Sequence, residues 1–286
     1  MNSEEVLRLS IKRGTITLNQ KKENLKMRFG VATGFENFDS VVKCGYDYFE
    51  GNLSLIAELS DEDYSKMLKK VQESPIKIET VNLFFPITLC VVGEKRDMSV
   101  LIEYTQKALA RAAELGVKVA VFGCGFARRV PEGYSYQKAL AELSEVLKMC
   151  ADVAAPLGIT IVIEPLRREE VNLINTVAEG LSMCKELNHP NIKCLADFYH
   201  VVNNGESLDA ISTAGDMLAH IHIARPTDRK APISEEDKTA CCEWNEALKT
   251  CGYNSRVSLE CIFDSNPQVF EETIKSARSV LECFNK

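Results

Sequence analysis

The stretch LKMCADVAAPLGITIVIEP, residues 147–165, contains the pattern from which the fold can be predicted. Its first part has the apolar spacing of an amphipathic helix, and Gly158 stands where such a helix usually ends. The apolar run 160–163 follows at once and leads into Glu164 and Pro165. A short, continuously apolar strand next to a helix is typical of a parallel sheet that is buried on both faces. The stretch therefore predicts one repeat of an α/β fold.

The same alternation recurs along the chain. Helical patterns such as 100–115, 138–157 and 267–284 stand between eight β-rich runs: 28–33, 46–50, 76–84, 118–123, 160–165, 192–198, 218–224 and 256–263. Eight strands alternating with eight helices in about 260 residues fit a closed (β/α)8 TIM barrel better than an open doubly wound sheet. No GxGxxG or GxxxxGK[ST] loop follows an early strand, which disfavours nucleotide binding.

Length and composition set further bounds. The barrel pattern begins only at Met27, so we expect residues 1–26 to be an N-terminal extension and residues 27–286 to form a single barrel domain. The formal net charge of -7 disfavours nucleic acid as a partner. The N-terminus lacks the apolar run of a signal peptide, and no stretch is apolar enough to span a membrane. Eleven scattered cysteines without a CxxC motif predict reduced thiols in a cytoplasmic protein.

Four ionisable residues stand at the ends of otherwise apolar strands. They are Glu164, Asp197, His222 and Glu260, on the fifth to eighth predicted strands. Active sites of such barrels lie at the carboxyl ends of the strands, so these side chains are expected to converge. Three converging carboxylates would repel one another without a cation between them. Three oxygen donors and one imidazole suit a divalent ion such as Mn²⁺, Mg²⁺ or Co²⁺ better than a structural zinc site.

Each residue also has a structural explanation. Taken singly, Glu164 or Glu260 could pair with an Arg, and Asp197 could cap the following loop. His220 and His222 lie two apart and hence on the same face of their strand; His222 is nearer the catalytic end, and His220 is expected to be a buried barrel residue. His200 lies just past a strand end, where it could bind a substrate hydroxyl or a loop carbonyl.

Several longer segments carry a family resemblance that extends over residues 27 to 284. They are GFARRVPEGYSYQKALAEL at 125–143, IVIEPLRREEVNLINTVAEG at 161–180, LADFYH at 195–200, AHIHIA at 219–224 and SLEC at 258–261. In order and spacing, the chain resembles the sugar phosphate isomerase/epimerase family with xylose isomerase-like barrels, and within it the ketose 3-epimerases. This resemblance implies Glu164, Asp197, His222 and Glu260 as the metal ligands.

The resemblance also implies residues that contact the substrate. These are Glu170, His200 and, as the nearest counterpart of the family's substrate-binding arginine, Arg229. The ligand would be a small sugar or sugar derivative, and because relatives often form dimers or tetramers, a homo-oligomer is expected. Mn²⁺ is the metal expected first, with Mg²⁺ or Co²⁺ as alternatives.

Two arginines depart from the family pattern. Arg167 stands where many relatives have Asn in EPLNR, and Arg225 follows AHIHIA where Asp is common. They could favour an anionic substrate group, or they could form salt bridges with Glu169, Glu170 or Asp228.

The ligand set predicts a reaction type. A cation that binds a ketose carbonyl and the adjacent hydroxyl acidifies the C–H between them and stabilises an enediolate. Glu164 and Glu260 could then act as base and acid on opposite faces, which inverts the carbon, most simply as ketose 3-epimerisation. Proton transfer on one face would give aldose–ketose isomerisation. The alternatives are a lyase on the same scaffold, such as an inosose dehydratase or an enzyme that cleaves 3-oxo-glycosides or C-glycosides, and a non-catalytic sugar-binding role. An endonuclease would need more histidines than four and a basic face.

Overall fold

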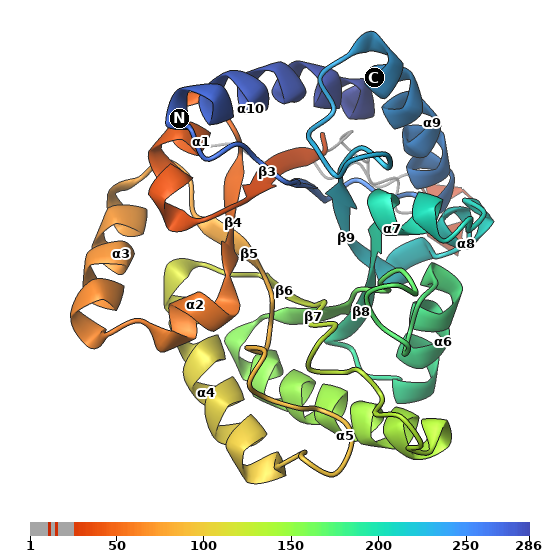
Figure 1. Ribbon diagram of the computed structural model, residues 1–286. Coiled ribbons are helices and arrows are strands. Elements are labelled where there is room, and N and C mark those ends of the chain that lie inside the picture. Colours follow the sequence, from red (N-terminus) through yellow and green to blue (C-terminus); the bar gives the residue numbers. More distant parts are fainter. Residues whose placement is uncertain (1–10, 13–14, 17–25) are drawn as a thin grey trace.

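The computed structural model describes residues 11–12, 15–16 and 26–286 (Figure 1). Eight parallel strands form a closed barrel, in which the last strand of the chain, β10, pairs with the first barrel strand, β3. The barrel strands are β3 Arg28–Ala32, β4 Tyr48–Asn52, β5 Ile78–Asn82, β6 Val119–Phe122, β7 Thr160–Ile163, β8 Ile192–Asp197, β9 Leu218–Ile223 and β10 Arg256–Glu260. The prediction of a (β/α)8 barrel is confirmed, and each predicted strand overlaps an observed one.

Helices surround the barrel (Figure 1). They are α1 Phe38–Lys43, α2 Leu53–Glu58, α3 Asp61–Glu73, α4 Met98–Leu115, α5 Tyr136–Ala154, α6 Val177–Leu187, α7 Phe198–Asn203, α8 Asp209–Ser212, α9 Glu235–Cys251 and α10 Pro267–Leu281. The expected one-to-one alternation is wrong at two places, because β4 is followed by α2 and α3, and β8 by α7 and α8. Local capping explains the split after β4: the Ser60 side chain accepts a hydrogen bond from Asp63 N–H and starts α3 as a separate helix.

Glycines end two of the long helices, as their positions in the sequence predict. Gly116 follows α4 with a φ of 100°, and Gly158 follows the 3-10 turn after α5 with a φ of 67°. Both values lie in the left-handed region, which costs glycine little because it has no Cβ. Each turn returns the chain to the barrel, where β6 and β7 begin.

The inside of the barrel is filled by side chains that point inward from alternate strand positions. Val119, Val121, Val162 and Leu195 form a buried apolar cluster there. Because side chains two residues apart share a face, Asp197 points the same way as Leu195, and His222 the same way as His220. The apolar cluster from β6, β7 and β8 thus lies below the polar residues at the carboxyl ends of β7 and β8.

The N-terminal residues that the structure describes do not join the barrel sheet. β1 Ile11–Lys12 pairs only with β2 Thr15–Ile16, antiparallel, in a sheet of two strands. Met27 is joined to the C-terminal end of the chain: its N–H donates to Asn285 Oδ1 at 2.7 Å, and Asn285 Nδ2 donates to Met27 O at 3.1 Å. Most of the predicted extension lies outside the described residues, so the domain boundary at Met27 stays a prediction.

A shortened chain that begins at Met27 tests this boundary. Because the pair of hydrogen bonds to Asn285 is retained, we expect its melting temperature to stay within about 2 °C of the full chain, with unchanged activity. Thermal unfolding followed by circular dichroism measures the first quantity. A larger drop in melting temperature would show that residues before Met27 stabilise the barrel.

In the part of the chain that the structure describes, none of the helices is both long and apolar enough to cross a membrane. All eleven cysteines are free, and six of them are buried: Cys124, Cys150, Cys184, Cys194, Cys241 and Cys283. These six behave as small apolar residues of the core, as expected.

Candidate metal centre and active site

The four residues singled out at the strand ends meet at one point. Glu164 directly follows β7, Asp197 ends β8, His222 lies in β9 and Glu260 ends β10. One donor atom from each of the four lies within 4.8 Å of the others. The imidazole Nδ1 of His222 is 3.1 Å from Glu164 Oε1 and 3.5 Å from Glu260 Oε2. The predicted convergence is therefore present.

The electrostatics of this cluster favour a cation. Burial and the charge of Glu260 raise the pKa of Glu164, and the same two causes raise the pKa of Asp197 to about 6. Asp197 Oδ2 is buried and has no hydrogen-bond partner among the described residues. Burial alone would lower the pKa of His222, but Glu50 and Glu260 outweigh it and raise that pKa well above its usual value. The carboxylates repel one another, and one buried oxygen has no partner, so a positive charge between them would be stabilising. Three carboxylate oxygens and one imidazole nitrogen form a ligand set that suits a divalent ion.

Glu260 is fixed by two donors on opposite sides. Asn82 Nδ2, at the end of β5, donates to Glu260 Oε1 at 2.8 Å, and Arg229 Nη2 donates to Glu260 Oε2 at 2.8 Å. Burial by itself would raise the pKa of Glu260, but His222 and Arg229 together lower it. The two glutamates therefore have different surroundings: Glu260 has positively charged neighbours, whereas burial and the charge of Glu260 act on Glu164.

Glu164 lies against the backbone of the neighbouring strand. A Cβ at Gly123, directly after β6, would come within 1.7 Å of Glu164 Oε2. The main-chain carbonyl of Glu164 accepts a hydrogen bond from Arg128 Nη2 at 2.5 Å. Arg128 is fully buried. Gly123 therefore leaves room for the Glu164 side chain, and Arg128 holds the Glu164 main chain.

Gly123→Ala is expected to displace the Glu164 carboxylate and to weaken binding of Mn²⁺ by more than about 10-fold. Calorimetric titration with Mn²⁺ measures the affinity. Gly125→Ala is the matched control, because its Cβ would contact the flexible end of Leu166 at 3.1 Å and no carboxylate. Equal affinities in the two variants would contradict the close approach of Glu164 to Gly123.

His200 lies beside the four converging residues with one ring nitrogen directed at them. It is 1% exposed. Its Nδ1 accepts a hydrogen bond from Arg167 N–H at 3.3 Å, so in the neutral ring Nε2 carries the hydrogen. Nε2 is 3.5 Å from Asp197 Oδ2 and is left without a hydrogen-bond partner within the described ranges. Burial lowers the pKa of His200, which favours this neutral donor form.

Glu170 and Arg229 form the next layer outward. Glu170 Oε1 accepts from Arg167 Nε at 2.8 Å and lies 3.5 Å from Arg229 Nη1. The guanidinium groups of Arg167 and Arg229 lie over the ring of Tyr199, at 5.0 and 4.9 Å from its centroid. Arg229 has a φ of 55°, a conformation that few non-glycine residues adopt. This backbone turn directs its side chain to Glu260.

The two arginines that depart from the family pattern both form salt bridges. Arg167 pairs with Glu170, and Arg225 pairs with Asp228, with Nε 3.0 Å from Asp228 Oδ1. Of the two interpretations that the sequence left open, the structure thus favours ion pairs within the loops.

Sequence reasoning missed several residues that shape the site. Asn82 ends β5 as Asp197 ends β8, and Glu50 is a charged residue within the strand β4, so their positions in VNLFF and FEGN offered a signal. Arg128 and Tyr199 offered no such signal in the sequence. They lie after the strand ends, in a loop and a short helix, and the direction of such segments cannot be predicted from residue spacing.

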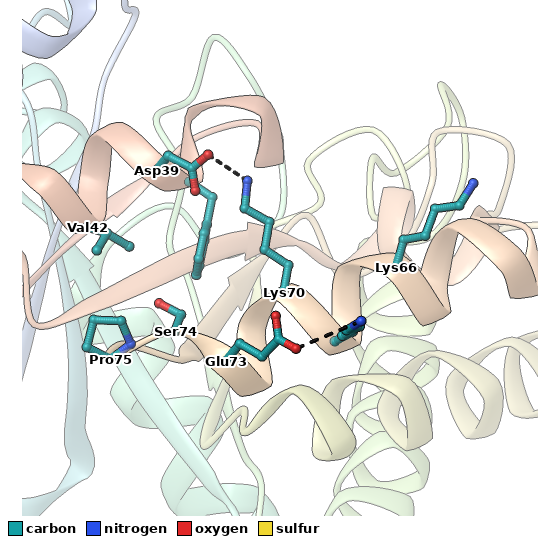
Figure 2. A pocket seen from close by; sticks show the side chains of 9 residues that line it. Asp39, Val42, Lys66, Lys70, Glu73, Ser74 and Pro75 are labelled. Atoms are coloured by element: carbon teal, nitrogen blue, oxygen red, sulfur yellow. Dashed lines mark hydrogen bonds and ion pairs between the residues drawn. The ribbon is translucent and has the colours of Figure 1, made fainter.

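A separate hollow lies on the outside of the barrel, between α1 and α3 (Figure 2). Three lysines border it, and each is paired: Lys66 with Glu62 at 2.7 Å, Lys69 with Glu73 at 4.0 Å and Lys70 with Asp39 at 2.8 Å. Its charges are already balanced, and its residues lie in the first part of the chain, away from β7 to β10. It is therefore a poor rival to the barrel mouth.

Comparisons with known proteins agree with this fold. D-psicose 3-epimerase from Agrobacterium fabrum (strain C58 / ATCC 33970) is 26% identical over 233 residues, which are 78% of this chain and 77% of that protein. The 3-dehydro-D-guloside 4-epimerase of Escherichia coli (strain K12) is 26% identical over 195 residues, 66% of this chain and 73% of that protein. A crystal structure of D-psicose 3-epimerase, determined in the presence of D-fructose, superposes with a TM-score of 0.77 at 22% identity, covering 90% of this chain and 98% of that one. The sequence profile described as "Xylose isomerase-like TIM barrel" matches residues 38–281, and the chain belongs to that family.

Proposed function

We propose that this protein is a divalent-metal-dependent sugar epimerase or isomerase, with ketose 3-epimerisation as its reaction. The observation that carries the proposal is the meeting of Glu164, Asp197, His222 and Glu260 at the mouth of the barrel. The relatives that match most of the chain are named as epimerases, which supports the same reaction class.

The two glutamates are assigned the proton transfers. A divalent cation held by Glu164, Asp197, His222 and Glu260 would polarise the substrate carbonyl and make the neighbouring C–H more acidic. Glu164 and Glu260 project from β7 and β10, which are separated by two strands, so they approach the substrate carbon from different sides. One removes the proton from one face and the other returns a proton to the opposite face, which inverts the carbon.

The neighbouring polar residues are assigned to substrate binding. His200 presents Nε2–H to the centre, where it can donate to a substrate hydroxyl. Glu170 can accept and Arg229 can donate at the outer edge of the barrel mouth, next to Glu260. These groups would hold a small sugar with its carbonyl towards the metal ligands.

We infer Mn²⁺ as the metal, with Mg²⁺ and Co²⁺ as substitutes, because three carboxylates and one imidazole form a hard, mixed ligand set. A cytoplasmic location and a homo-oligomeric assembly stay predictions from the sequence and from the resemblance to relatives.

The lyase alternative gains no support, because the named relatives that match most of the chain are epimerases. The two reactions are readily distinguished: a lyase releases a product of different mass, whereas an epimerase conserves mass.

A substrate screen in deuterated water tests the proposal. D-psicose, D-fructose, ketose phosphates, inososes and 3-oxo-glycosides are incubated with the Mn²⁺-loaded protein and followed by NMR. The proposal predicts that a ketose loses its C3 hydrogen signal while its epimer appears, heavier only by the deuterium taken up at C3. Elimination products from an inosose or a 3-oxo-glycoside, without epimerisation, would establish the lyase instead. Tight binding of a sugar without exchange of any C–H would show a binding protein.

A further inference from the structure

A second buried carboxylate lies directly beneath the candidate metal centre. Glu50, on β4, is completely buried, and its two oxygens accept hydrogen bonds from three side chains. Oε1 is 2.8 Å from His222 Nε2, while Oε2 is 2.9 Å from His220 Nε2 and 2.8 Å from Thr80 Oγ1. The acid–base roles assigned above leave this residue without a task. Burying a carboxylate is costly unless such partners are supplied, so the arrangement is specific.

The contact with His222 determines which ring nitrogen can bind a cation. A neutral imidazole carries hydrogen on one nitrogen and a lone pair on the other, and an ionised carboxylate can only accept. Because Glu50 lies against Nε2, the hydrogen belongs on Nε2. The lone pair is then on Nδ1, the nitrogen that lies 3.1 Å from Glu164 Oε1 and 3.5 Å from Glu260 Oε2. Glu50 thus sets both the tautomer and the orientation of His222.

The same residues could be considered as a second metal site, because Glu50, His220 and His222 each offer a donor atom within 4.8 Å of the others. Three facts favour hydrogen bonds instead. Both nitrogen–oxygen distances are ordinary hydrogen-bond lengths, Thr80 already donates to the shared oxygen Oε2, and all three side chains are fully buried. An ion there would also require a deprotonated Nε2 on the ring whose Nδ1 faces the outer centre.

We propose that Glu50 is a positioning residue, which holds His222 in the Nε2–H tautomer so that Nδ1 is the metal ligand. This role of Glu50 rests on the proposed metal centre but can be tested separately from it, because a metal could bind to the four outer residues through either nitrogen of His222.

The direct test is a long-range ¹H–¹⁵N NMR spectrum of the ¹⁵N-histidine-labelled full chain loaded with Zn²⁺, a diamagnetic probe. With only four histidines, the signals of His222 are identified by their loss in His222→Gln. The proposal predicts hydrogen on Nε2 and the shift of a metal-bound nitrogen at Nδ1. Hydrogen on Nδ1 with Nε2 bound to the metal would overturn it, and this result needs no Glu50 variant to fold.

Variants add a measurement of strength by Mn²⁺ titration. Glu50→Leu removes the acceptor, and we expect about 10- to 100-fold weaker Mn²⁺ binding, as is usual for loss of a residue that orients a ligand. Glu50→Gln keeps an acceptor oxygen and is expected to restore most of the affinity. Thr80→Val is the matched control, because it removes a hydrogen bond to the same carboxylate without touching His222.

The results of these titrations distinguish the positioning role of Glu50 from the metal centre itself. Wild-type affinity in folded Glu50→Leu would overturn the positioning role and leave the metal centre intact. Two Mn²⁺ ions per wild-type chain and one in Glu50→Leu would make Glu50 a ligand, which also overturns it. Absence of Mn²⁺ binding in the wild-type protein would reject the metal centre itself.

Discussion

Glu260→Gln is expected to lower the exchange of the substrate's C3 hydrogen with solvent deuterium by at least about 10²- to 10⁴-fold, the usual contribution of a general acid or base. Glutamine has nearly the shape of glutamate and can still accept from Arg229 through its carbonyl oxygen. The variant loses the charge and the basicity but keeps the size of the side chain. Exchange is measured by NMR with Mn²⁺ in excess, so that weaker metal binding does not limit the rate.

Glu169→Gln is the matched control for this experiment. Glu169 is exposed and lies on the same loop as Glu170, five residues beyond Glu164, and the same chemical change there should leave the exchange rate unaltered. Wild-type exchange in metal-saturated Glu260→Gln would remove Glu260 from the proton transfers. An equal loss in both variants would point to a general electrostatic effect at the barrel mouth.

Removal of the metal is expected to have the other large effect. Dialysis against EDTA should reduce activity below detection, and Mn²⁺, Co²⁺ or Mg²⁺ should restore it. Because a ligand of the folded state stabilises by about 2.7 kcal/mol at 100 times its Kd, Mn²⁺ at that excess should raise the melting temperature by about 5 °C. Full activity in the chelated protein would reject the metal proposal.

Asp197→Asn distinguishes a bound cation from a general effect of salt. Burial and the charge of Glu260 raise the pKa of Asp197 to about 6, so its negative charge is unfavourable in the protein without metal. We expect the chelated variant to melt no lower than the chelated wild-type protein, since the amide can keep the hydrogen bond from Tyr199 N–H. The rise on adding Mn²⁺ should disappear. An unchanged rise in the variant would place the ion elsewhere.

The barrel and its central residues could be predicted because their signals are local. An ionisable residue at the end of an apolar strand is costly unless it has a partner, and Glu164 and Asp197 both stand in that position. The spacing of two in AHIHIA placed His220 and His222 on one face and assigned His220 to the barrel interior, where it is fully buried. Parallel strands that close into a barrel then bring such ends together, whatever their separation along the chain.

The remaining features depend on contacts that sequence spacing does not encode. Whether Glu50 is a surface carboxylate or a buried acceptor for two histidines depends on the pairing of β4 with β3 and β5 and on the closure of the barrel. The direction of the Arg229 side chain depends on a backbone φ of 55° at that residue. None of the residue types in the segment TDRK requires such a conformation. The start of a second helix after β4 depends on the Ser60 cap, which competes with continuation of α2.

An anomalous difference map from crystals soaked with Mn²⁺ would locate the metal ion itself. We expect one peak at the mouth of the barrel, within about 2.5 Å of an oxygen of Glu164, Asp197 and Glu260 and of Nδ1 of His222. A map without a peak among these four side chains, or with the ion bound elsewhere on the chain, would contradict this expectation.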